Sequence, residues 1–188
     1  YLGFWMKRLD PQAYERDAYY GSLQWRIAGA EAPARAMSSP RFVYRFDWDN
    51  LSKPLWMDLP GIFGAAHAFE LPFVIGDIDF GPLTDMINAS EDKEGIKDLS
   101  NSMMNYWGNF AHQGDPNLGK PVPAVWKQWR QEEQFLVFDD KEGGGIRGGK
   151  GGTTMEGLVD QLAADDSFDS QQERCELFEE LGKWGLTI

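Results

Sequence analysis

The sequence predicts an α/β chain with a few strands and several helices. Aromatic and polar residues alternate over 41–49, which is typical of a strand with one covered face. A continuously apolar run over 135–138 fits a buried strand. Apolar residues recur at helical spacing before, between and after these two runs. The aromatic face of the first strand must therefore be covered by other elements.

Length and composition limit the classes of function that are open to this protein. Its 188 residues, 42% of them hydrophobic, suit one packed domain, and we expect no internal boundary within 1–188. The formal net charge of −12 argues against nucleic acid and against anionic membrane surfaces as partners. Cys175 is the only cysteine, so no internal disulfide is expected. No run approaches the ~20 apolar residues of a membrane span, and both the cytoplasm and export remain open as compartments.

The first half of the chain leads to a single histidine. Residues 10–37 have a helical pattern, and the strand over 41–49 follows. The segment 50–64 contains prolines and glycines and reads as a long loop, which in a compact domain is more often functional than idle. This loop delivers His67, which stands between small residues at the edge of the apolar run 71–75. Such a histidine can be held in place and still be reached, although a histidine satisfied by hydrogen bonds at a loop edge is the alternative.

The second half alternates surface segments with helices. Residues 77–94 are polar and are expected at the surface, with one short helix. The positions 99, 103, 107 and 110 are apolar at helical spacing, and Gly114 ends this helix. His112 falls in its last turn, where an imidazolium faces the carbonyl end of the helix dipole, and we assign it no chemistry. Two capping boxes open C-terminal helices, Thr153-x-x-Glu156 and Ser170-x-x-Glu173.

The glycine-rich segment 143–152 resembles two kinds of nucleotide site. A phosphate cradle needs a helix that begins directly at the loop, and a Ser or Thr after the lysine. Here Gly151 follows Lys150, and the acids at 139, 140 and 142 place negative charge where a phosphate would sit. We therefore interpret the segment as a flexible surface loop. The two histidines make no recognisable set of metal ligands, so no metal or cofactor is expected.

Three blocks of sequence together resemble one known family. The first block is the strand pattern over 42–49. The second is Gly-x-x-His-x-x-Glu-Leu-Pro-Phe-Val-x-Gly over 64–76, and the third runs from Leu99-Ser100 through Tyr106-Trp107 to the Gly-Asp-Pro-Asn turn at 114–117. In this order they resemble the C-terminal part of the type-B carboxylesterase and cholinesterase family of α/β-hydrolases, and most closely its bacterial members. The resemblance implies the C-terminal part of that fold, with an incomplete central sheet.

The resemblance implies acyl transfer at a serine. His67 matches the family's catalytic histidine, and Glu70 matches a glutamate that would fix the histidine loop; a solvated loop acid is the alternative for Glu70. The nucleophile should stand in a Gly-x-Ser-x-Gly turn, yet no serine here has glycine two residues away on both sides. Because the chain order is serine, acid, histidine, both partners are expected upstream of Tyr1, and we expect the chain to begin mid-protein. Acids also precede His67 within the chain: Asp10, Glu15, Asp17, Glu31, Asp47, Asp49 and Asp58.

The sequence thus predicts the histidine-bearing segment of a serine esterase that is inactive by itself and needs no cofactor. Its expected partners are the N-terminal remainder of its own polypeptide and a small ester substrate, which Trp56, Met57 and Phe69 would border. The C-terminal helix packs either internally or against a second copy in a homodimer. Two other classes stay open: a non-catalytic cholinesterase-like binding or adhesion module, and an autonomous acidic α/β interaction domain.

Overall fold

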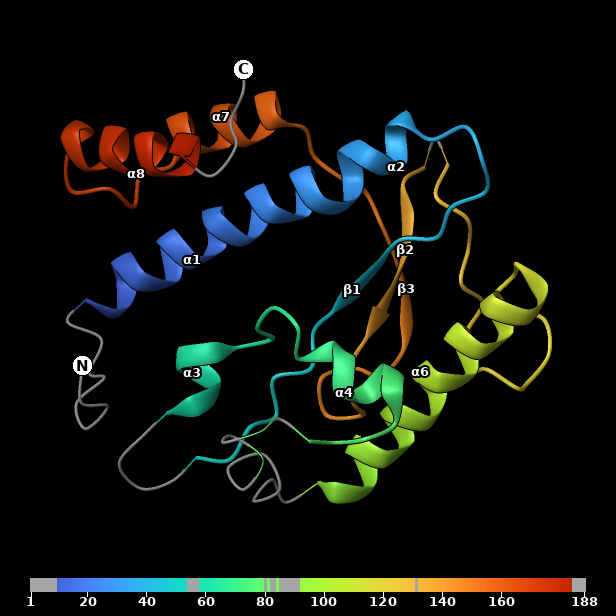
Figure 1. Cartoon of the computed structure of the whole chain (residues 1–188). Helices are drawn as coiled ribbons and strands as arrows, with labels where there is room; N and C mark the ends of the chain where they lie inside the picture. Colours follow the sequence, from blue (N-terminus) through green and yellow to red (C-terminus); the bar gives the residue numbers. More distant parts are fainter. Residues whose placement is uncertain are drawn as a thin grey trace. The chain divides into compact units, whose positions relative to one another are not determined.

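The computed structural model describes residues 10–53, 58–79, 81, 84, 92–130 and 132–183, and its ribbon is drawn in Figure 1. The described chain forms two compact units. We call Phe42–Lys150 the sheet unit, and Tyr1–Arg41 together with Gly151–Ile188 the helical unit. The absence of an internal domain boundary, expected from the length, stays a prediction. Within the described residues no helix combines the length and apolar character that a membrane crossing requires.

The sheet unit contains a three-stranded sheet in the order β1-β2-β3. β1 (Tyr44–Phe46) is parallel to β2 (Gln134–Phe138), with Tyr44 opposite Leu136, and β2 is antiparallel to β3 (Arg147–Lys150). The outer edge of β1 has no partner strand among the described residues. Both predicted strands are therefore confirmed, and the sheet is small and open at β1, as expected for part of an α/β-hydrolase fold.

The predicted amphipathic helix is α6 (Lys93–Gln113), and it covers the aromatic face of the sheet. Asp92 caps its first turn, and Gly114 ends it in the left-handed conformation, where glycine avoids the steric penalty of a Cβ. The rings of Tyr44 and Trp107 lie 5.1 Å apart. The aromatic residues over 42–48 all belong to the core or pack against it, which confirms the predicted alternation: Phe42, Tyr44, Phe46 and Trp48.

Two short helices lie on either side of His67, one of them within the segment that the sequence suggested was a long loop. The loop over 50–64 contains α3 (Leu59–Phe63), capped by the Asp58 carboxylate, and the apolar run after His67 is α4 (Glu70–Ile75). Neither helix was predicted, because each has a proline near its start and proline is a common loop signal, although it is also well tolerated in the first turn of a helix. Most of the expected surface segment over 77–94 lies outside the described residues.

The glycine-rich segment 143–152 is not the flexible loop that the sequence suggested, because Arg147–Lys150 forms β3. A Cβ on Gly149 would collide with the ring of Phe135 on β2, the residue directly opposite. The glycine leaves room for this ring, so the segment pairs with β2 despite its low intrinsic strand propensity.

The helical unit confirms the helix predicted over 10–37, in three consecutive pieces. They are α1 (Pro11–Arg26), capped by Asp10, the π-helical turn η1 (Ile27–Glu31) and α2 (Ala32–Ala36). α1 packs on α7 (Met155–Ala164) and α8 (Gln171–Lys183). The first capping box is displaced by one residue, because Thr154 caps α7, whereas Ser170 accepts from the Glu173 N–H as predicted. The shared core comprises Tyr20, Leu23, Ile27, Leu158, Leu162, Leu177 and Leu181.

The helical unit buries one carboxylate, that of Glu31 at the end of the π-helical turn. Its side chain is 2% exposed and lies 2.7 Å from the Arg26 Nε and 3.3 Å from the Arg35 Nη2. The backbone N–H of Thr153, just before α7, donates to it at 2.8 Å. One buried charge therefore joins the N-terminal helices to the start of the C-terminal pair.

Candidate functional site

His67 lies in the turn between α3 and α4, and its side chain is exposed. The next residue, Ala68, has φ +70°, a left-handed conformation that costs a non-glycine residue about 1 kcal/mol or more. Strain of this kind persists only where the surrounding structure imposes it. The structure thus places His67 at an exposed position beside a strained residue, and the catalytic role expected of it stays a prediction.

Glu70, the predicted loop-fixing acid, is the first residue of α4. Its charge is felt at Tyr44 on β1: burial, and then the negative charge of Glu70, raise the pKa of Tyr44 to about 12. This electrostatic interaction relates the residue three positions after His67 to the sheet, and sequence reasoning did not identify it.

Helix α4 is also fastened to α6. The buried hydroxyl of Ser100 donates to the backbone carbonyl of Phe73 at 2.9 Å. Gly76 ends α4 in a left-handed conformation, at a place where a Cβ would meet the Met104 side chain. Sequence reasoning missed Ser100 as well; the signal was a small polar residue within the apolar stripe of a helix.

The residues expected to border the site are only partly described. Trp56 and Met57 lie outside the described residues. Phe69 is partly buried and packs against the core, with its ring 6.2 Å from that of Phe63. In α3 and α4, the helices before and after His67, the apolar side chains of Phe63, Leu71 and Ile75 are 38%, 51% and 71% exposed. Both helices thus present apolar side chains to solvent.

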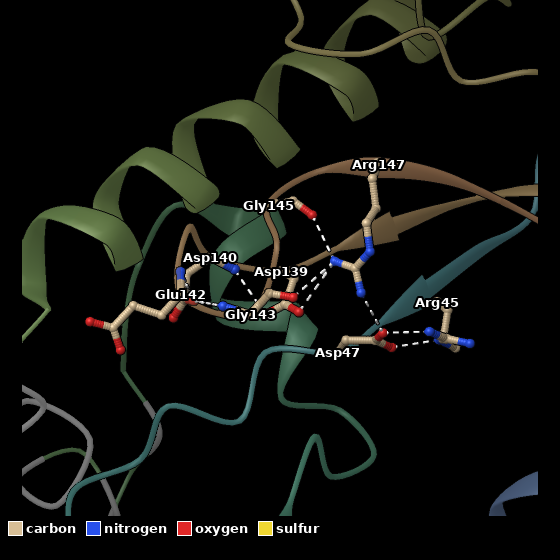
Figure 2. A network of polar contacts seen from close by, with 8 residues as sticks. All are labelled: Arg45, Asp47, Asp139, Asp140, Glu142, Gly143, Gly145 and Arg147. Atoms are coloured by element: carbon tan, nitrogen blue, oxygen red, sulfur yellow. Dashed lines mark hydrogen bonds and ion pairs between the residues drawn. The ribbon is translucent and has the colours of Figure 1, made fainter.

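Two acids that precede His67, Asp49 and Asp47, differ in what they contact. Asp49 is exposed after β1. Asp47 instead joins a network that Figure 2 shows, in which Arg45 contacts both of its carboxylate oxygens at 2.6 Å. The Nη2 of Arg147 lies 3.5 Å from Asp47, and the Nη1 of Arg147 lies 3.4 Å from Asp139. Asp47 is therefore committed to ion pairs with Arg45 in β1 and with Arg147 at the start of β3.

Asp139 is the buried member of this network (Figure 2). Burial raises the pKa of its carboxyl, and the Arg147 guanidinium acts in the opposite direction. Arg147 also donates to the carbonyls of Gly143 and Gly145, at 3.1 and 3.0 Å, so it fixes the β2–β3 turn as well as the acid.

The same turn does not offer a phosphate site. The N–H groups of Glu142 and Gly143 both donate to the Asp140 carboxylate at 3.0 Å (Figure 2). A phosphate would need these amides, which an internal carboxylate already occupies. A cavity of about 390 Å³ opens between the turn and α6, and His67 is not among its lining residues. In the described part of the chain, no three His, Cys, Asp or Glu residues lie in a group suited to a metal ion.

Comparisons with known proteins agree with this geometry. The sequence profile of the "Carboxylesterase family" matches residues 17–150, which is more than half of the chain. Para-nitrobenzyl esterase of Bacillus subtilis (strain 168) is 36% identical over 121 residues, which cover 64% of this chain and 22% of that protein. Mouse neuroligin-3 is also 36% identical, over 130 residues that cover 65% of this chain and 14% of that protein.

A solved structure supports the fold in the same way. The crystal structure of a Geobacillus stearothermophilus carboxylesterase at pH 6.2 matches with a TM-score of 0.50 and 21% identity, over 77% of this chain and 30% of that one. The chain spans less than a quarter of the length of either curated relative named above. The profile, which includes the strand, the histidine turn and α6, establishes that this chain belongs to the carboxylesterase family.

Proposed function

We propose that this chain is the histidine-bearing segment of a serine carboxylic ester hydrolase. The observation that carries the proposal is His67, which occupies the family's histidine motif, is exposed, and lies in the turn after α3, in the part of the chain that follows β1. The α/β-hydrolases place reacting groups at the carboxyl ends of the sheet strands. The whole polypeptide would supply the serine, the acid and the oxyanion donors.

His67 would act as a general base and then as a general acid, because it accepts a proton and later returns it. A serine hydroxyl is a poor nucleophile at neutral pH, so the imidazole accepts its proton as the oxygen attacks the ester carbonyl. The same imidazole then returns that proton to the departing alcohol, which leaves an acyl-serine. A water molecule, deprotonated by His67 in turn, releases the acid. Exposure of His67 in this chain fits a ring that must meet groups contributed by another part of the polypeptide.

The experiment compares p-nitrophenyl acetate hydrolysis by the parent polypeptide, by this segment, and by the parent with His67→Ala. We expect activity in the parent, none in the segment, and at least a thousandfold loss in the variant, which is the order of loss when a triad member is removed. His112→Ala is the matched control, since His112 is an exposed residue in the last turn of α6. Hydrolysis by the segment alone, or by the His67 variant at the parent's rate, would refute the proposal.

A second candidate is a non-catalytic cholinesterase-like binding or adhesion module. The match to neuroligin-3 supports this alternative, because this chain is as similar to neuroligin-3 as it is to para-nitrobenzyl esterase, with 36% identity to each. A Gly-x-Ser-x-Gly turn in the upstream sequence favours the hydrolase, and its absence favours the binding module. Retention of an imidazole in the complete motif also favours the hydrolase, because a silent module has no chemical need for it.

A further inference from the structure

We propose that Ser100 is a positioning residue, which holds α4 and thereby the His67 turn in the orientation that the reaction requires. This inference rests on the proposed function. Ser100 is assigned no contact with substrate. Its hydroxyl contacts α4 from α6.

Ser100 completes the hydrogen bonding of α4 at its C-terminal half. In a regular helix the carbonyl of Phe73 would accept from the N–H of Asp77, but that N–H bonds to the Pro72 carbonyl at 3.2 Å. The Ser100 hydroxyl, which is buried, donates to the Phe73 carbonyl at 2.9 Å. Loss of the hydroxyl would leave a buried carbonyl unsatisfied, and the helix end would have to move to find water.

This hydrogen bond matters because α4 depends for its place on packing against α6 and the core, and the Ser100–Phe73 bond belongs to that contact. Helix α4 has six residues, fewer than the number that makes a stable helix in water. Phe73 is fully buried, whereas Leu71 and Ile75 are 51% and 71% exposed. His67 is three positions before Glu70, with the strained Ala68 between them, so a shift of α4 is transmitted directly to the imidazole.

The test measures kcat and KM of the parent polypeptide with Ser100→Ala, and counts active sites by the burst of p-nitrophenol. Ser102→Ala is the matched control, because Ser102 is on the same helix and its hydroxyl bonds to its own helix at the Asp98 carbonyl. We expect kcat per active site to fall at least about tenfold in Ser100→Ala, with KM within about twofold, since small displacements of a catalytic group carry losses of this order. Ser102→Ala should retain the parent's kcat. Ser100→Thr, which restores the hydroxyl, should recover most of the activity.

Equal kcat per site in Ser100→Ala and Ser102→Ala would overturn the inference. If Ser100→Ala does not fold, Ser100→Cys decides, because it keeps the shape and replaces the hydroxyl by a weakly donating thiol; an unchanged kcat per site in that variant overturns the inference as well. The proposed function fails separately: a fully active His67→Ala variant refutes it, whereas an inactive His67→Ala beside a fully active Ser100→Ala refutes only the positioning role.

Discussion

The buried Glu31 carboxylate gives the sharpest test of what stabilises the helical unit. The perturbation is Glu31→Gln, which keeps the shape and one acceptor oxygen but removes the charge. In the structure this carboxylate contacts Arg26 at 2.7 Å, Arg35 at 3.3 Å and the Thr153 N–H at 2.8 Å. The neutral amide can still accept from Thr153, whereas both guanidinium groups lose their anion.

The magnitude follows from how buried each partner is. Breaking a fully buried ion pair costs about 3–5 kcal/mol. The Arg26 and Arg35 side chains are 31% and 30% exposed, so water replaces part of the lost interaction. We therefore expect Glu31→Gln to lower the free energy of unfolding by about 2 kcal/mol, and Glu31→Ala by about 3 kcal/mol because the Thr153 contact is lost as well.

The assay is urea denaturation followed by circular dichroism at 222 nm, since this unit is mostly helical. Glu180→Gln, an exposed change on α8, is the control and should stay within about 0.5 kcal/mol of the unmodified chain. A double-mutant cycle that combines Glu31→Gln with Arg35→Gln should give a coupling free energy of about 1 kcal/mol between positions 31 and 35. If Glu31→Gln is as stable as Glu180→Gln, the reasoning about this charge is wrong.

Three other changes test the sheet unit. Ala68→Gly should raise the free energy of unfolding by about 0.5–1 kcal/mol, because the relief of strain at φ +70° exceeds the extra backbone entropy that glycine loses on folding. Chemical denaturation measures this change, and a loss of stability would contradict it. Gly149→Ala should destabilise the sheet unit by about 1–3 kcal/mol, because the new Cβ collides with Phe135. The control Gly148→Ala, whose Cβ would point into open space, should change the stability by less than about 1 kcal/mol, and equal thermal midpoints of the two variants would refute this prediction. Burial, and then the negative charge of Glu70, raise the pKa of Tyr44 from 10.0 in the unfolded chain to about 12 in the folded one. Between these pH values the folded state binds more protons than the unfolded state, so the stability falls as the pH rises from 10 to 12. After allowance for solvent screening, Tyr44→Phe should reduce that fall by about 1 kcal/mol in denaturation curves at pH 9 and pH 12, and an identical fall in both proteins would contradict the shift.

Periodic patterns made most of the fold predictable. The alternation over 42–48 and the stripe along α6 each gave the correct element and the correct buried face, since both reflect burial against a single core. The short helices α3 and α4 escaped prediction because their prolines and glycines resemble loop signals. β3 escaped because its pairing depends on the Phe135 ring across the ladder, which is a tertiary contact rather than a local preference.

The candidate site was predictable only where a motif names its residues. His67 and Glu70 could be identified from the motif, and the roles assigned to them stay predictions. Ser100 could not be found in this way, because a serine in a helix has many ordinary uses. Its contact with α4 becomes visible only when elements distant in the sequence are brought together.

The parallel pairing of β1 with β2 has a consequence for how the protein assembles. It joins Tyr44 to Leu136, so the whole stretch that contains the histidine turn and α6 forms a loop closed by this contact. Closing this loop costs conformational entropy before the hydrogen bonds between β1 and β2 contribute any stability. The neighbouring β2–β3 hairpin is local in sequence and can form early. The imidazole should therefore reach its final position late in folding, and a chain interrupted anywhere between the two strands would lose the means of holding it there.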